Sequence, residues 1–239
     1  MESSPPWIIK WLSAPRWQTY INAAHQDPHL ALELYEWSVE LAGALMHDIA
    51  HFEIALRNRF CAAIESNWDG QQHWLLDPKS PVRKENQRLT FIEKAQSKQA
   101  VDLNARNRQR IDEVIRRLPS ANPTPDSIIA ELPLGFWKHM TARGQEQNLW
   151  IPYIYYAFPR GTSRSNVFEA LSHINTLRNR VAHHEPLVSE ASAQQIAQCQ
   201  KLIRDLLGML LPELAEYISR TSKVKKLMDE RPLGGSRTE

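Results

Sequence analysis

One amphipathic pattern, which begins at Asp27 and runs to about Ser66, constrains the fold more than any other feature of the sequence. Its apolar side chains recur at steps of three and four residues, the spacing that lines one face of an α-helix. These side chains include Leu45, Ile49, Phe52, Leu56 and Phe60. Asp27 supplies a capping carboxylate, and Pro28 fits the first helical turn. We therefore expect one long helix here.

Further helices are expected along most of the remaining chain, which contains only 8 glycines. The expected helical segments are 83–118, one that begins after the cap Thr124, one that begins at Ser165 or Asn166, and one from Ser189 to Ile218. For 83–118, an interruption near Ser97 stays open, and its sparse apolar stripe includes Leu89. The aromatic run "WIPYIYYAFP", residues 150–159, is the one candidate for a strand. We predict an all-α fold with a single domain over residues 1–219 and a disordered tail over residues 220–239.

Composition and charge exclude several classes of protein. Hydrophobic content of 42% and charged content of 23% are ordinary for a soluble globular chain. No run approaches the roughly 18 apolar residues of a membrane span, so we expect no membrane association. Cys61 and Cys199 lack the spacing of a disulfide framework or a zinc site, and a reducing, cytoplasmic location is expected.

A basic segment extends from Lys79 to Arg117, with 11 Lys or Arg residues against five Asp or Glu. A net charge of +6 in such a short segment suits a surface that follows the phosphates of a nucleic acid. The candidate RNA-binding residues are Arg83, Lys84, Arg106, Arg108 and Arg110. The alternative is an ordinary solvated helix face.

The run "LRNRVAHHEPL", residues 177–187, gathers polar residues at the end of an expected helix. Since Glu185 precedes a proline, the helix should end near His183 or His184. Asn179 and His183 are four residues apart and share one helix face. Histidine is suited to proton transfer near neutral pH, and the neighbouring Arg178 could hold a phosphate. The simpler alternative is a set of cationic residues that complement the helix dipole.

Other constellations give weaker signals. "HDIAH" places His47 and His51 one helical turn apart, a spacing that can chelate zinc, but no third ligand follows at a recognisable distance. We expect no metal site there. No Gly-rich phosphate loop and no Gly-x-Ser-x-Gly motif occurs, so nucleotide hydrolysis and serine-hydrolase chemistry are not indicated.

Three segments together resemble the Abi-like (abortive infection) branch of the HEPN superfamily. "LRNRVAHHEP" is similar to the Arg-Asn-x-x-x-His signature of that superfamily. "FEIALRNRF", residues 52–60, is similar to the earlier Glu-x-x-x-Arg motif, and "IAELPLGFWKHM", residues 129–140, to the segment that separates the two motifs. The resemblance covers roughly Leu34 to Leu187 in the expected order.

The resemblance implies a HEPN-like helical bundle and a metal-independent endoribonuclease without a cofactor. The 2′-hydroxyl of RNA would attack its own phosphodiester and leave a 2′,3′-cyclic phosphate. Arg178 would stabilise the transition state, His183 would be the general acid or base, and Asn179 would orient the phosphate or the histidine. Glu53 and Arg57 would support the cleft. His184 also satisfies the spacing and is the alternative to His183.

Such enzymes act in phage defence or as toxins, so the implied partners are RNA, a second copy of the chain in a homodimer, and a neutralising antitoxin, protein or RNA. Two other functions stay open on the sequence. One is a HEPN-fold protein that binds RNA without cutting it. The other is a helical interaction module without an RNA role, in which Glu53 and Arg57 form an ordinary ion pair on a helix surface.

Overall fold

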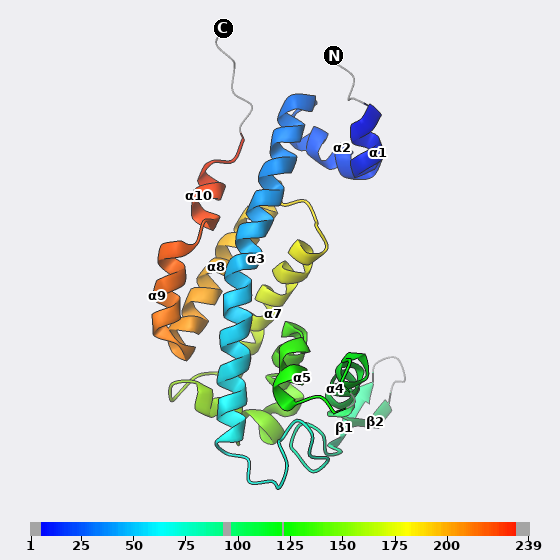
Figure 1. The fold of residues 1–239 in the computed structure, drawn as a ribbon, viewed down its shortest axis with the longest axis vertical. Helices are drawn as coiled ribbons and strands as arrows, with labels where there is room; N and C mark the ends of the chain where they lie inside the picture. Colours follow the sequence, from blue (N-terminus) through cyan, green and yellow to red (C-terminus); the bar gives the residue numbers. More distant parts are fainter. Residues whose placement is uncertain (1–5, 93–96, 121, 233–239) are drawn as a thin grey trace. The chain divides into compact units, whose positions relative to one another are not determined.

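A computed structural model describes residues 6–92, 97–120 and 122–232 (Figure 1). Its regular elements are helices apart from one pair of short strands, which confirms the all-α prediction. The chain forms two compact units, residues 1–52 with 176–239 and residues 53–175. The division falls within α3 (Pro28–Glu65) and within α7 (Arg164–Ala182). A single domain over residues 1–219 stays a prediction.

The long helix α3 begins and ends where the sequence pattern predicts. The carboxylate of Asp27 accepts hydrogen bonds from the backbone amides of His29 at 2.8 Å and Leu30 at 3.2 Å, so it caps the helix. All five residues of the predicted stripe are fully buried. The prediction is confirmed because both signals are local: a cap at one end and an apolar period along the length.

The first unit is made of helices only, within the described residues. Its elements besides parts of α3 and α7 are α1 (Pro6–Leu12), α2 (Ala14–Ala23), α8 (Glu190–Leu210), α9 (Pro212–Thr221) and α10 (Val224–Asp229). The hydroxyl of Ser189 caps α8 by accepting the amide of Ser192 at 3.1 Å, which confirms the predicted start of this helix. Its predicted end at Ile218 is wrong, because the chain breaks at Leu211 and Pro212 begins α9. The indole of Trp37, on α3, donates to the carbonyl of Leu227, on α10, at 2.6 Å.

The segment after Arg220 differs from the predicted disordered tail. Residues 222–232 are described, and α10 buries Val224, which is 3% exposed. The guanidinium of Arg231 donates to the carbonyl of Val188 at 2.7 Å. The charged residues of this segment outnumber its apolar ones, and its anchoring depends on distant partners that composition does not reveal. Residues 233–239 lie outside the described part of the chain.

The second unit contains the main correction to the sequence analysis. Residues 83–118 are not one helical region: β1 (Gln87–Ile92) pairs with β2 (Ser97–Asp102) in an antiparallel hairpin, and α4 (Ala105–Arg117) follows. The register joins Gln87 to Asp102 and Ile92 to Ser97. Leu89, which belongs to the sparse apolar stripe expected there, is 70% exposed. Its run "LTFI" consists largely of residues that favour strands, and the sparse helical period was misleading.

Short helices complete the second unit. The hydroxyl of Thr124 accepts the amide of Ser127 at 3.3 Å, which confirms it as the cap of α5. The strand candidate at residues 150–159 instead forms turns and short helical pieces, with Trp150 buried and Tyr156 exposed. The elements after the hairpin are α5 (Pro125–Glu131), α6 (Leu134–Met140), η2 (Arg143–Gln145), η3 (Glu146–Trp150) and η4 (Ile154–Ala157).

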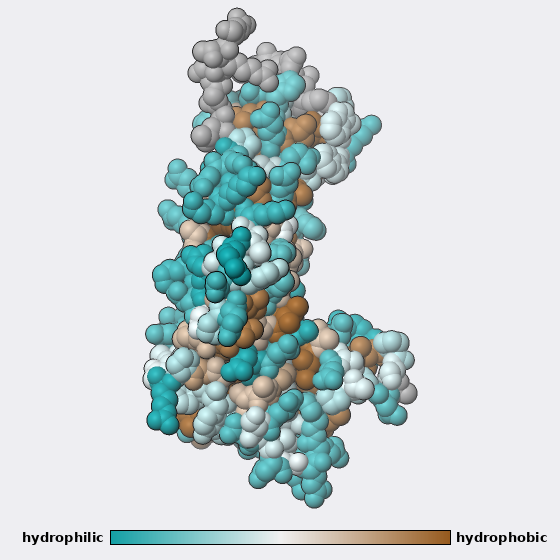
Figure 2. Space-filling view, turned by 60° about the vertical axis from the view of Figure 1, so that its left-hand side comes forward, coloured by the Kyte–Doolittle hydropathy of each residue, from teal (hydrophilic) through white to brown (hydrophobic). Residues whose placement is uncertain are grey.

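The visible surface is mostly hydrophilic, with apolar side chains in scattered groups (Figure 2). Some large aromatic side chains are exposed, among them Trp7 and Trp11 of α1, whose rings stack 5.9 Å apart. Across the described residues, no helix combines the length and the apolar character needed to cross a membrane.

Candidate functional site

The end of α7 is shaped by a Schellman motif. The amide of Glu185 donates to the carbonyl of Arg180 at 2.9 Å, and the amide of His184 donates to the carbonyl of Val181 at 3.0 Å. His184 takes the left-handed conformation, with φ of 55°, that such an end requires and that glycine usually supplies. His183 is therefore the last residue before the chain turns away, as the proline at 186 predicts.

Arg180 holds this helix end in place. Its guanidinium donates to the carboxylate of Glu185 at 2.9 Å, to the carbonyl of Pro186 at 3.3 Å, to the hydroxyl of Ser192 at 3.1 Å and to the side chain of Gln195. These contacts connect α7 to the loop and to the first turns of α8. Arg180 is therefore a structural residue, although the sequence alone places two arginines beside the signature asparagine.

Three predicted catalytic residues lie together on the last turns of α7. Asn179 and His183 are exposed and four residues apart on the helix, and the amide of His183 donates to the carbonyl of Asn179 at 2.9 Å. Arg178 is half-buried. Proton transfer requires an imidazole that solvent and substrate can reach, and His183 meets that condition. The Schellman motif fixes the backbone from which its side chain projects.

Glu53 and Arg57 lie on α3 in the second unit, four residues apart on one side of the helix. Both are half-buried. The guanidinium of Arg57 donates to the carbonyl of Ala130, in α5, at 3.3 Å, while its Nε is buried without a hydrogen-bond partner. Arg57 thus connects the Glu-x-x-x-Arg segment with residues 129–140. A single cleft that unites these residues with Arg178 and His183 stays a prediction.

The five candidate RNA-binding residues divide into two groups. Arg83 pairs with Asp112 at 2.8 Å, and Arg108 pairs with Asp102 and donates to the carbonyl of Arg83 at 2.9 Å. These two arginines hold the hairpin, α4 and the preceding loop together. The side chains of Lys84, Arg106 and Arg110 are exposed, with Arg110 pairing to Glu113 at 2.7 Å. For the exposed group, a role as a phosphate-binding surface stays a prediction.

A buried carboxylate in the first unit was missed by the sequence analysis. Asp48 is fully buried and accepts hydrogen bonds from Gln200 Nε2 at 3.1 Å and Ser222 Oγ at 2.5 Å, and it contacts Nδ1 of His47 at 3.0 Å. It anchors both α8 and the start of the C-terminal segment to α3. The signal was present, because Asp48 stands three residues after Leu45 and so falls on the buried stripe.

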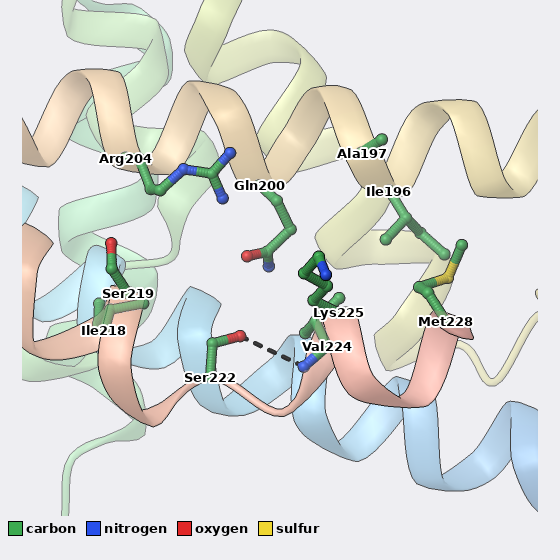
Figure 3. A pocket seen from close by; sticks show the side chains of 10 residues that line it. All are labelled: Ile196, Ala197, Gln200, Arg204, Ile218, Ser219, Ser222, Val224, Lys225 and Met228. Carbon is green, nitrogen blue, oxygen red and sulfur yellow. Dashed lines mark hydrogen bonds between the residues drawn. The ribbon is translucent and has the colours of Figure 1, made fainter. Parts of the chain in front are cut away.

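Beside this anchor, α8, α9 and α10 enclose a cavity of about 560 Å³ (Figure 3). Side chains of Gln200 and Arg204, both on α8, and of Lys225, on α10, extend toward it, and Ser222 accepts the amide of Val224 at 3.3 Å at its edge. Its remaining lining is largely apolar. Lys225 also lies 3.4 Å from the carboxylate of Asp229.

The histidines of "HDIAH" are neighbours, with ring centroids of His47 and His51 4.7 Å apart. In residues 6–92, 97–120 and 122–232 there is no group of three or more His, Cys, Asp or Glu arranged to hold a metal ion. Both cysteines are free and buried. Burial raises the pKa of Cys61 and of Cys199 to about 12, so neither thiol provides a nucleophile at neutral pH.

No curated protein and no solved structure matches the chain. A family model described as "Abi-like protein" matches residues 18–189. This range covers well over half of the sequence and includes α3, the hairpin, α5, α6 and α7 with its histidines. The chain therefore belongs to the Abi-like protein family.

Proposed function

We propose that this Abi-like protein is a metal-independent endoribonuclease of the HEPN type. Membership of the Abi-like family indicates a role in abortive infection, and an enzyme that cuts RNA in an infected cell, or acts as a toxin, would perform that role. The observation that carries the proposal is the end of α7. There, Asn179 and His183 are exposed on a helix end that the Schellman motif fixes, and Arg178 adjoins them in sequence.

The proposed reaction uses the RNA's own 2′-hydroxyl as nucleophile. The 2′-oxygen attacks the adjacent phosphorus, the bond from phosphorus to the 5′-oxygen breaks, and the products end in a 2′,3′-cyclic phosphate and a 5′-hydroxyl. His183 either removes the proton from the 2′-hydroxyl or supplies one to the departing 5′-oxygen. Arg178 stabilises the charge on the phosphoryl oxygens, and Asn179 orients the phosphate or the imidazole.

The remaining parts of the proposal concern the cleft and its partners. Glu53 and Arg57 would support the cleft from α3, with Arg57 fixed against the carbonyl of Ala130. The exposed Lys84, Arg106 and Arg110 would attract the RNA backbone. A homodimer that brings two copies of the signature to one groove, and an antitoxin that restrains the activity, complete the proposal by analogy with related enzymes.

Cleavage of total RNA by the purified full-length chain in EDTA tests the proposal. The parent protein should release cyclic-phosphate ends, His183→Ala should release none, and His184→Ala is the matched control that should retain cleavage. Product termini are mapped by whether ligation of the 3′ ends requires prior removal of the cyclic phosphate. Equal cleavage by the parent and His183→Ala would reject the assignment of His183.

An RNA-binding protein that does not cut is the second candidate. The exposed basic residues of the loop before β1 and of α4 favour it, since they suit a phosphate backbone whether or not it is cleaved. If the parent and His183→Ala both bind RNA in a salt-sensitive way and neither forms cleavage products, this candidate is supported and the nuclease is contradicted.

A further inference from the structure

A small cavity in the second unit is lined by two residues that each carry a buried polar atom without a hydrogen-bond partner. It lies between α4 and α6, with a volume of about 40 Å³. Asn107 Oδ1 and His139 Nε2 are buried and make no hydrogen bond, and both residues line this cavity. A buried polar atom without a partner typically costs about 1–3 kcal/mol, so such atoms are rare and require an explanation.

The side chain of Asn107 is fixed by its neighbours. Its Nδ2 donates to Oδ1 of the buried Asn104 at 3.2 Å. Asn104 in turn donates to the carbonyls of Pro81 at 2.8 Å and Lys84 at 2.9 Å, so its own amide cannot be turned round without losing both bonds. These hydrogen bonds fix the orientation of the Asn107 amide, so its Oδ1 remains an acceptor without a partner, on a residue that lines the cavity.

His139 presents a second acceptor. The amide of Leu103 is committed to the carbonyl of Asn86, and the backbone of Leu103 raises the pKa of His139, which is the direction that an accepting carbonyl gives. The same carbonyl also accepts Gln145 Nε2 at 2.9 Å. Because Nε2 of His139 has no partner, its hydrogen bond with Leu103 engages Nδ1. Burial, with the adjacent positive charge of Arg106, lowers the pKa of His139, which keeps the ring neutral at pH 7. A neutral ring that donates through Nδ1 has Nε2 as an acceptor.

The lining of the cavity is positively charged and contains no carboxylate. Arg106 and Arg110 line it, together with Gly135 and His139. In the part of the chain that the structure describes, Arg106 is exposed and its side chain makes no hydrogen bond or ion pair. The two acceptors, the guanidinium of Arg106 and that of Arg110, which also pairs with Glu113 at 2.7 Å, suit one group that donates a hydrogen bond and carries an anion beside it.

We propose that this cavity binds one ribose phosphate unit of RNA. The 2′-hydroxyl enters and donates to Asn107 Oδ1 or His139 Nε2, while the neighbouring phosphate lies on Arg106 and Arg110. The cavity volume suits a hydroxyl, since a water molecule occupies about 30 Å³ in the liquid. The site distinguishes RNA from DNA, because only RNA supplies the hydroxyl. The choice of RNA as the ligand rests on the proposed function. The site would place recognition of the ribose on residues outside the catalytic signature.

Full-length protein carrying His183→Ala, which should not consume its ligand, tests this site. Fluorescence anisotropy compares a 12-nucleotide oligouridylate with the matching deoxyuridine oligomer at several salt concentrations. Arg106→Ala should weaken RNA binding about tenfold, as loss of a charge-assisted hydrogen bond predicts. It should also reduce the preference over DNA, because the phosphate contact is what holds the 2′-hydroxyl at the cavity. Arg116→Ala removes another exposed arginine from α4, outside the cavity, and should keep the preference.

A second measurement avoids mutation of the buried residues. Uridine 3′-monophosphate should shift the ring signals of His139 in the nuclear magnetic resonance spectrum, and 2′-deoxyuridine 3′-monophosphate should shift them less. An unmoved His139, or equal losses for Arg106→Ala and Arg116→Ala, would mean that the cavity holds water only, and would overturn the site. If the parent protein still cleaves RNA when those results are obtained, the proposed nuclease activity stands although the ribose site does not. A ribose preference without any cleavage would support the site and reject the nuclease.

Discussion

Arg180 and Glu185 are joined twice, once through the backbone and once through their side chains. The amide of Glu185 donates to the carbonyl of Arg180 at 2.9 Å, and the guanidinium of Arg180 donates to the carboxylate of Glu185 at the same distance. The Schellman motif that ends α7 and the salt bridge that covers it thus involve the same two residues. The exposed His183 owes its position to this pair.

The first prediction concerns this helix end. Arg180→Ala should lower the free energy of unfolding by about 2 kcal/mol, because the substitution leaves Glu185, Gln195 and Ser192 without a shared donor. Arg220→Ala is the control, since Arg220 forms only an exposed pair with Glu216 and should change stability by less than about 0.5 kcal/mol. Urea unfolding measures both, and equal effects would contradict the structural role of Arg180.

The second prediction separates the two adjacent histidines. His184 has a φ of 55°, which costs a residue with a side chain roughly 1 kcal/mol. His184→Gly should therefore unfold at the same or a higher temperature and retain cleavage of RNA. His183→Ala should abolish cleavage. Calorimetry and the RNA assay on the same preparations check both statements. If His184→Gly is inactive but keeps an intact melting transition, His184 rather than His183 would be the residue that transfers the proton.

The third prediction concerns the buried carboxylate of α3. Asp48→Ala should reduce the free energy of unfolding by roughly 3 kcal/mol, because Gln200 and Ser222 would lose their acceptor in a buried position. Asp205→Ala is the matched control, since Asp205 is exposed and paired only with Lys201 on its own helix. If Asp48→Ala unfolds like the control, the carboxylate does not anchor α8 and the C-terminal segment.

The features that the sequence predicted correctly have local causes. The start of α3 follows from Asp27, the start of α5 from Thr124 and the end of α7 from Pro186. In each case a side chain acts on backbone groups within three or four residues, so the signal and its consequence lie in the same short stretch.

The features that it missed depend on distant partners. Whether residues 87–92 and 97–102 form strands is decided by cross-strand pairing such as Gln87 with Asp102, which a helical period cannot report. The same holds for Arg83 and Arg108, whose charges suggested RNA binding but are engaged by Asp112 and Asp102. Charge counts identify a basic segment without showing which of its members are already paired.

The fourth prediction follows from that division. Lys84→Ala should weaken RNA binding and reduce the slope of log affinity against log salt by about one, because one phosphate contact is lost. Arg108→Ala should instead lower the melting temperature, since Arg108 connects Asp102 with the carbonyl of Arg83. Anisotropy titrations and thermal melts of both variants provide the comparison. A salt slope that stays unchanged in Lys84→Ala would remove this lysine from the RNA surface.

The fifth prediction is a pH dependence that originates at His139. Burial, then the charge of Arg106, lowers its pKa in the folded chain from the ordinary value near 6.5, Lys138 acts in the same direction, and the hydrogen bond with Leu103 opposes them. Above about pH 6.5 the ring is neutral in both states. As the pH falls below that value, the unfolded chain takes up the proton first, so stability decreases until the folded pKa is passed.

His139→Gln should remove this part of the decrease, because glutamine does not titrate. Urea unfolding at about pH 7.5, 6.5 and 5.5 should therefore show a smaller loss of stability in His139→Gln than in the parent chain. The exposed His173 provides the control, and His173→Gln should follow the parent curve. If both variants lose as much stability as the parent, the ring of His139 is already accessible to protons in the folded state. The assignment of a neutral His139 ring as the acceptor at the cavity is then wrong.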